Sequence, residues 1–204
     1  MDKVDFKKTL KALYGPPTRD FVIVDVPAMR FIMLDGYGDP NTAGEYATGL
    51  NWLYSISYGL KFASKRELGR DYVVPPLEAL WWADDMSDFV TRRKDRWRWT
   101  VMLMVPNFVP AALFEPARAA ASAKLGEAPK SLRLETFAEG LSVQIMHVGS
   151  YDDEGPTLRR LHEEYLPKNG LVEAGHHHEI YISDPRKVAP AKLKTVLRQP
   201  VRRR

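Results

Sequence analysis

The distribution of apolar and polar residues predicts strands in the first forty residues and a long helix after them. Residues 21–40 are rich in apolar and β-branched side chains, are interrupted by Pro27 and end in a Gly/Asp/Pro turn. In residues 41–68, apolar and aromatic side chains recur at helical spacing. Asn41 or Thr42 is the expected N-cap of this helix, supported by Glu45.

The rest of the chain alternates between strand and helix signals in a similar way. Residues 110–125 predict an alanine-rich helix, in which Pro116 indicates a kink or a late start and Gly126 is the expected C-cap. A second, shorter helix is expected to end at Asn169–Gly170. The remaining segments predict strands, at 72–83, 96–109, 132–151, 174–185 and 192–201.

An internal repeat organises these segments. The residues "IMLDGYGDP" at 32–40 align without gaps with "IMHVGSYDD" at 145–153. Each copy is followed by a helix and then by a strand with a central glutamate, Glu78 or Glu179. We therefore expect an α+β fold in which one domain, residues 1–204, contains two strand–helix–strand–strand repeats. These span approximately 20–109 and 130–204 and are linked by a helix at 110–125. Paired antiparallel sheets with helices on one face would leave a ligand groove.

Composition excludes several classes of site and location. The chain has 204 residues, of which 45% are hydrophobic, 27% are charged and none is cysteine. The absence of cysteine excludes disulfides, thiolate catalysis and cysteine-ligated zinc. No apolar run reaches the roughly 18 residues of a membrane span, and the first residues lack the apolar stretch of a signal peptide. A cytoplasmic protein with no membrane partner is expected.

The basic residues are concentrated in two segments of a chain with a net charge of +4. One reads "TRRKDRWRW" and the other is the terminal "LRQPVRRR". A basic tail can contact phosphates, but a solvated, frayed terminus explains it as well. The chain has no helix-turn-helix pattern, zinc-finger spacing or aromatic RNA-binding signature, so nucleic acid is not an expected partner.

Three consecutive histidines precede a glutamate in the strand predicted at 174–185. Alternation along a strand assigns these side chains to two faces: His176, His178, Ile180 and Ile182 on one, and His177, Glu179 and Tyr181 on the other. Three histidines therefore cannot converge on one metal from a straight strand, and we expect no metal site. A carboxylate next to isoleucines in a strand lowers stability unless it is paired with a cation, hydrated or part of a functional site. Glu179 either faces solvent, pairs with an Arg or Lys, or lines a functional cleft.

Four long motifs give the chain a family resemblance. They are "VPPLEALWW", "RWRWTVMLMVPNFV", "VQIMHVGSYDDEGPTLRRLHEEYLPKNG" and "HHEIYISDPRKVAPAKLKTVLRQPV". With these, the sequence resembles the stand-alone branch of the GyrI-like small-molecule-binding family, which is related to the effector-binding domains of multidrug-responsive transcription activators. The resemblance implies a duplicated fold with a ligand cleft at a pseudo-twofold axis.

The resemblance also implies several functions. In the transcription-factor relatives, a buried glutamate of the cleft recognises cationic aromatic drugs. Some stand-alone relatives hydrolyse cyclopropane-bearing DNA alkylators, and other members of the wider family restrain DNA gyrase. Glu179 is then expected to line the cleft as a general base, with Glu78 assisting and Tyr181 donating a hydrogen bond. Apolar surroundings are expected to raise the pKa of Glu179.

Aromatic and flexible side chains are the candidates for holding a ligand. Alternation along its strand assigns Trp82 to the cleft, although both members of the Trp81–Trp82 pair could equally be core. Further candidates are Trp97, Trp99, Met104, Tyr37, Tyr151 and His177, for which core packing or loop closure is the alternative.

The sequence therefore predicts a protein that binds flat, hydrophobic small molecules, cationic ones included, without a cofactor. The first functional hypothesis is a hydrolase that opens cyclopropane-bearing compounds. The alternatives are a binding module that sequesters or senses a drug, and a protein that restrains a gyrase. Whether the chain forms a homodimer is left open by the sequence.

Overall fold

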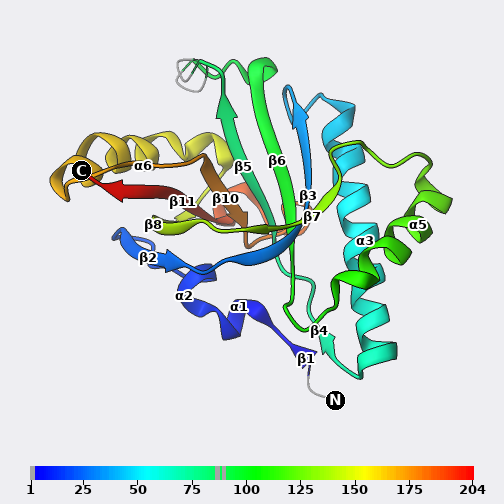
Figure 1. The fold of residues 1–204 in the computed structure, drawn as a ribbon. Helices are drawn as coiled ribbons and strands as arrows, with labels where there is room; N and C mark the ends of the chain where they lie inside the picture. Colours follow the sequence, from blue (N-terminus) through cyan, green and yellow to red (C-terminus); the bar gives the residue numbers. More distant parts are fainter. Residues whose placement is uncertain (1–2, 86–87, 89–90) are drawn as a thin grey trace. The chain divides into compact units, whose positions relative to one another are not determined.

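The computed structural model describes residues 3–85, 88 and 91–204, which form two compact units. Unit 1 takes the N-terminal residues up to Thr9, Met29–Pro75 and Ala79–Phe137. Unit 2 takes Leu10–Ala28, Pro76–Glu78 and Ala138–Arg204. Each unit combines helices with an antiparallel sheet, so the predicted α+β class is confirmed (Figure 1).

Unit 1 is built on four strands in the order β5–β6–β3–β7. Their bounds are β3 Met29–Tyr37, β5 Leu77–Ala83, β6 Trp97–Val105 and β7 Arg133–Phe137. Strand β3 pairs antiparallel with both β6 and β7. The helical elements are α1 (Phe6–Thr9), α3 (Gly44–Leu68), η1 (Lys94–Arg96), η2 (Ala111–Leu113) and α5 (Phe114–Leu125). A short parallel pair, β1 (Lys3–Val4) and β4 (Asp71–Tyr72), completes the unit.

Helix α3 covers one face of the β3–β6 pair, and α5 packs against α3 on its other side (Figure 1). A Cβ atom added at Gly49 would lie 3.1 Å from the Leu34 side chain, which shows how closely helix and sheet approach. At Gly36 an added Cβ would lie 2.0 Å from the indole ring of Trp99, so only glycine fits opposite this tryptophan.

Unit 2 has the equivalent strand order, β2–β8–β11–β10, with β9 pairing to the end of β11. Its strands are β2 Val22–Val26, β8 Gly140–Val148, β9 Leu171–Glu173, β10 His177–Tyr181 and β11 Lys194–Arg203. Its helical elements are α2 (Lys11–Tyr14), η3 (Tyr151–Asp153), α6 (Gly155–Arg159), the π-helical segment η4 (Arg160–Tyr165), α7 (Leu166–Lys168) and η5 (Pro190–Lys192). A core cluster joins the helical segment to the sheet through Val143, Leu161, Leu166, Leu171 and Val201.

Both units follow the same order along the chain. In unit 1, β3 is followed by α3, β5 and β6, and in unit 2, β8 is followed by the α6–α7 segment, β10 and β11. The edge strands β7 and β2 take equivalent places beside β3 and β8. Pro27 separates β2, which belongs to the sheet of unit 2, from β3, which belongs to that of unit 1.

Several local predictions can be compared with these elements. The late start of the helix predicted at 110–125 is confirmed, because α5 begins at Phe114 with Pro116 in its first turn. Gly126 is its C-cap, at φ +92°. The predicted N-cap of α3 is wrong. Asp39 accepts hydrogen bonds from the backbone of Asn41 and Ala43, so the chain turns there and α3 begins at Gly44 without a side-chain cap.

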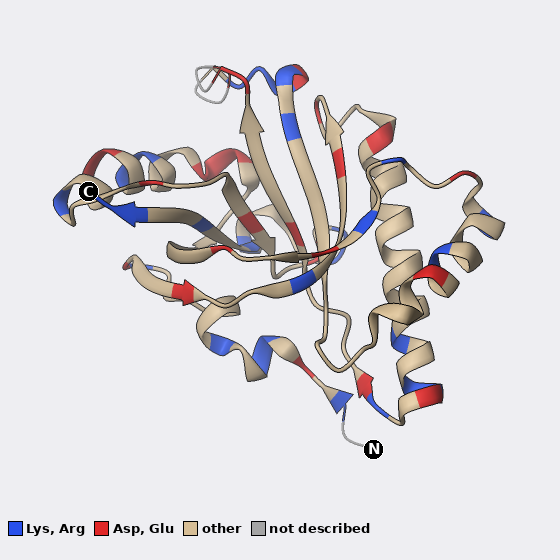
Figure 2. Ribbon diagram, in the orientation of Figure 1, with Lys and Arg blue, Asp and Glu red and all other residues tan. Residues whose placement is uncertain are grey.

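The basic C-terminus is also more ordered than expected. Arg202 and Arg203 pair with Val172 and Leu171 of β9, so the terminus is a strand end and not a frayed tail. Their side chains are exposed, and Figure 2 shows the blue of these basic residues at the end of β11. Within the part of the chain that the structure describes, no helix is long and apolar enough to span a membrane.

Candidate functional site

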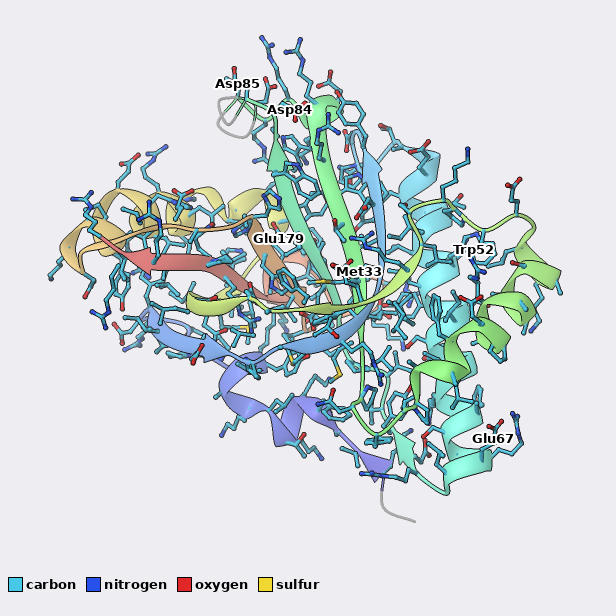
Figure 3. The ribbon with its side chains drawn as sticks, in the orientation of Figure 1. Met33, Trp52, Glu67, Asp84, Asp85 and Glu179 are labelled. Carbon is cyan, nitrogen blue, oxygen red and sulfur yellow. The ribbon has the colours of Figure 1, made fainter. Side chains whose placement is uncertain are left out.

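Strand β10 sends two adjacent side chains, His178 and Glu179, to opposite faces of the unit 2 sheet. His178 and Ile180 are fully buried, whereas His177, Glu179 and Tyr181 alternate with them and are partly accessible. The two-face assignment made from the sequence is therefore confirmed for His177–Tyr181, whereas His176 and Ile182 lie outside the strand. Figure 3 labels Glu179 on this strand. Two separate clusters of polar side chains result, one on each face.

The Glu179 cluster comprises Tyr151, Glu154, His177, Glu179 and Tyr181. The Tyr181 hydroxyl donates to Oε2 of Glu179 at 2.7 Å, and Nε2 of His177 lies 3.5 Å from Oε1. Glu154 is buried and close enough to influence the ionisation of both Glu179 and Tyr151. The ring of Tyr151 packs edge-on against Tyr181, with 5.6 Å between ring centroids.

The contacts of Glu179 decide its charge. Burial raises the pKa of Glu179, but the neighbouring His177 ring and the hydrogen bond from the Tyr181 hydroxyl outweigh burial and hold the pKa below its usual range. The expectation of a raised pKa is therefore wrong, because the sequence could not show which side chains surround this carboxylate. Glu179 is an anion at neutral pH. Burial, together with the negative charges of Glu179, Glu154 and Asp184, raises the pKa of Tyr151 to about 12.

The second cluster, the His178 network, lies on the opposite face of β10. It comprises six buried side chains: Tyr14, Glu78, Glu139, Gln144, His178 and Arg198. His178 lies between two carboxylates, with Nδ1 2.8 Å from Glu139 and Nε2 3.0 Å from Glu78. The Tyr14 hydroxyl donates to the other oxygen of Glu78 at 3.0 Å.

Arg198 extends the His178 network to the N-terminal segment of unit 2. Its guanidinium donates to Glu139, to the side-chain oxygen of Gln144 and to the carbonyl oxygen of Leu13, each at 2.9 Å. Gln144 in turn donates to the carbonyl oxygen of Ala12 at 2.6 Å. The segment that contains α2 is thereby attached to the sheet by buried hydrogen bonds.

The charges of the His178 network compensate one another. Burial lowers the pKa of His178, but Glu139 and Glu78 outweigh burial and raise it to about 9. Burial raises the pKa of Glu139, but His178 and Arg198 outweigh burial and lower it to about 2. At neutral pH two buried cations therefore face two buried carboxylates, which satisfies the rule that buried charges must be paired.

The structure places Glu78 in the His178 network and not in the Glu179 cluster. Glu78 is fully buried and contacts His178 and Tyr14. His178 lies on the face of β10 opposite Glu179, so the two glutamates, although equivalent in the sequence repeat, serve different clusters. No partner for Glu78 could be predicted from the sequence, because Tyr14 and His178 are distant from it in the chain.

The structure also divides the predicted tryptophans between the two faces of the unit 1 sheet. Trp99 is fully buried and contacts Tyr46 of α3 edge-on at 5.0 Å. Trp81 stacks on the same tyrosine, and Trp97 packs against Trp81. Trp97 and Trp99 therefore lie on the helix-covered face of the unit 1 sheet. Trp82 alternates with Trp81 and points to the other face.

The other predicted ligand residues have contrasting environments. Met104 is buried on the face of the unit 1 sheet away from α3, opposite Phe31 in the β3–β6 register. Tyr37 is half-exposed at the end of β3, and the guanidinium of Arg98 lies 5.6 Å from its ring centroid. Of the predicted site residues, the structure thus joins Tyr151, His177, Glu179 and Tyr181 in one cluster.

A match to a protein-family model identifies the family. The chain matches the model of the GyrI-like small-molecule-binding domain over residues 19–202. The protein belongs to this family. No curated protein matches the chain.

Two solved structures from Listeria innocua are similar to this GyrI-like protein over almost its whole length. One is described as an uncharacterized conserved protein, with 40% identity and a TM-score of 0.88, and one as a hydrolase, with 39% identity and a TM-score of 0.83. Each comparison covers 98% of this chain and 100% of the other. The C-terminal domain of EcmrR, at 13% identity and a TM-score of 0.58 over 91% of this chain and 98% of that domain, shares the fold alone.

Glu154 and Glu139 are the site residues that the sequence analysis missed. Glu154 ends the acidic run at 152–154, in which Asp152 and Asp153 are exposed and only Glu154 is buried. Glu139 precedes the turn glycine Gly140 and has no apolar periodicity around it. Neither carries a signal that distinguishes it from a surface acid.

Proposed function

We propose that this GyrI-like protein is a hydrolase that opens activated cyclopropane rings in genotoxic or xenobiotic compounds, with Glu179 as the general base. The observation that carries the proposal is the Glu179 cluster. An ionised carboxylate accepts a hydrogen bond from a phenol at 2.7 Å, with a histidine nitrogen 3.5 Å away and the partly exposed ring of Tyr151 in the same cluster.

Two further observations support a hydrolytic role. The 39% identical Listeria innocua protein is a hydrolase, and it aligns with 98% of this chain. The family resemblance adds the substrate class, since some stand-alone relatives hydrolyse cyclopropane-bearing DNA alkylators. A fold alone does not establish a reaction, so the proposal depends on the side chains of the cluster.

The proposed reaction adds one water to the substrate. Glu179 removes a proton from a water molecule as the water oxygen forms a bond to the cyclopropane methylene carbon. The cyclopropane C–C bond breaks, and its electron pair moves through the conjugated dienone to the carbonyl oxygen, which then takes up a proton. The product is heavier than the substrate by one water and no longer contains the electrophilic ring.

Aromatic side chains would hold the flat substrate. Tyr151 contributes a phenol ring next to Glu179, and stacking on such rings is worth about 0.5–1.5 kcal/mol beyond the buried area. His177 orients Glu179 through its ring nitrogen.

The test is a turnover assay with product masses resolved. The wild-type protein and Glu179→Gln are incubated with a cyclopropane-bearing dienone, with the exposed Glu163→Gln as the matched control. We expect a product heavier by one water from the wild type and the control, and none from Glu179→Gln. Equal turnover by Glu179→Gln would remove Glu179 from the mechanism.

A non-catalytic binder is the second candidate, because the lowered pKa of Glu179 also suits a permanent anion that attracts cationic ligands. A carboxylate with a depressed pKa is a weaker base. In this case no product forms, and Glu179→Gln weakens the binding of a cationic aromatic dye much more than that of its neutral analogue. Isothermal calorimetry with the two dyes separates the candidates.

A further inference from the structure

Helix α3 carries three aromatic side chains in a row on the side away from the sheet. Tyr54, Tyr58 and Phe62 follow one another at intervals of four residues, so they lie on one side of the helix and form an aromatic stripe. The ring centroids of Tyr54 and Tyr58 are 6.5 Å apart, and those of Tyr58 and Phe62 are 6.2 Å apart. Tyr58 is 46% and Phe62 is 57% exposed, so the stripe presents a large apolar area to solvent.

The helix offers almost no charge beside this stripe. No residue from Tyr46 to Leu60 is charged, and Figure 2 shows this part of α3 in tan. Lys61, the next residue, is buried and paired with Asp71. A helix with one side in solvent normally has charged residues on that side. An exposed side that is rich in aromatic residues and lacks charge has instead the composition of the centre of a protein–protein interface.

Helix α5 adds an uncharged surface next to the stripe. A Cβ atom added at Gly59 of α3 would lie 3.4 Å from the Ala117 side chain, so the two helices are in contact there. Residues 119–123 of α5 are all alanine or serine. Large rings on α3 beside small side chains on α5 provide the ridge and groove with which helices interlock. Half of the exposed large apolar side chains in the part of the chain that the structure describes belong to these two helices: Tyr58, Phe62, Leu68 and Leu125.

We propose that the aromatic stripe, with the adjoining side of α5, is the contact surface of a symmetric homodimer in which the α3 helices of two copies pack antiparallel. A twofold contact requires a patch that is complementary to itself. The stripe meets this requirement, because an antiparallel copy centred on Tyr58 places Tyr54 of each chain opposite Phe62 of the other. Every ring of the stripe then meets a ring of the second copy. The inference is independent of the hydrolase function proposed above.

The charges at the two ends of α3 fit this arrangement. Glu45 lies in the first turn of the helix, whereas Lys65 and Arg66 lie in the last turn. Antiparallel packing brings the acidic end of one helix to the basic end of the other, and it also brings opposite ends of the two helix dipoles together. A parallel pair would place like charges and like dipole ends side by side. A second copy of the chain therefore matches this surface in both its apolar centre and its charged ends.

The first test maps the contact with single cysteines, because the chain contains none of its own. Asn51 and Lys65 are exposed and lie seven residues before and after Tyr58, so they meet each other in the antiparallel dimer. We expect Asn51→Cys and Lys65→Cys to form a mixed disulfide on oxidation several-fold faster than either variant links to itself. Val148→Cys, exposed in unit 2, serves as control for random collision. A mixed disulfide no faster than this control would overturn the contact, and preferential linking of each variant to itself would overturn the antiparallel arrangement.

The second test measures the oligomeric state by sedimentation over a range of micromolar concentrations. We expect a dimer for the wild type and for the control Val148→Glu. Tyr58→Glu places two charges at the centre of the contact, so the Kd of the dimer should rise by about 30-fold or more. Because Tyr58 and Phe62 are exposed, their replacement leaves the fold intact, and Phe62→Ser gives a second, independent variant. A monomeric wild type, or a dimer that neither variant weakens, would overturn the proposal.

Discussion

Replacing His178 with glutamine should change how the stability of the protein depends on pH. In the wild type, His178 is fully buried between Glu139 and Glu78, and its pKa rises from 6.5 to about 9. Because the folded-state pKa lies above the unfolded one, the protonated histidine stabilises the fold fully below the unfolded pKa. This contribution is lost as the pH rises through about 9.

The size of the effect follows from the same shift. One pKa unit corresponds to about 1.4 kcal/mol, so the rise from 6.5 to about 9 amounts to about 3 kcal/mol of stability between near-neutral and alkaline pH. At about pH 6, His178→Gln should also lower the free energy of unfolding by about 3–5 kcal/mol, because it leaves two buried carboxylates with one cation, Arg198. The total free energy of unfolding of such a domain is about 5–15 kcal/mol, so a loss of this size is measurable.

Urea unfolding of both proteins at several pH values between about 6 and 10 provides the assay. The difference in unfolding free energy between wild type and His178→Gln should shrink by about 3 kcal/mol across this range, since other titrating groups are common to both. Parallel stability curves would refute the reasoning, because they would mean that His178 is neutral in the folded protein or that its charge is not compensated.

Two further predictions concern Glu179 and Gly36. The rate of cyclopropane hydrolysis should be constant around neutral pH and fall only below the ordinary glutamate pKa of 4.5, because the lowered pKa keeps the Glu179 base ionised. A rate that falls as the pH is lowered from about 8 to 6 would contradict this. Gly36→Ala should lower the melting temperature and reduce the free energy of unfolding by about 1–3 kcal/mol, because the added Cβ would lie 2.0 Å from the Trp99 ring. An unchanged melting temperature would contradict this and show that Trp99 can move away.

Periodicity was sufficient to predict the elements and the two faces of β10. Alternation along one strand depends only on backbone geometry, so Glu179 and Tyr181 were assigned to one face and His178 to the other before their partners were known. The repeat likewise anticipated the strand–helix–strand–strand order found in each unit.

Partners that are distant in the chain could not be predicted in this way. The Tyr14–Glu78 hydrogen bond joins residues 64 positions apart, and the contact between Arg198 and the Leu13 carbonyl joins residues 185 apart. No local pattern encodes such pairings, and for this reason the sequence did not place Glu78 beside Tyr14 and His178. The pKa shift of Glu179 was predicted in the wrong direction for a related reason, because the sequence does not show which side chains surround its carboxylate.

The tryptophans show a related limit. Trp97 and Trp99 were correctly placed on one face of their strand, but the sequence does not say which face α3 covers. Their contacts with Trp81 and Tyr46 settle this, and the same contacts leave Trp82 as the aromatic residue on the opposite face.

The most direct test of the central claim is to follow hydrolysis in water enriched in a heavy oxygen isotope, with wild type and Glu179→Gln side by side. If Glu179 activates water for attack on the cyclopropane, the wild type forms a product that carries one heavy oxygen, and Glu179→Gln forms none. Labelled product at equal rates from both proteins would contradict the account, because the ring would then be opened without the Glu179 carboxylate.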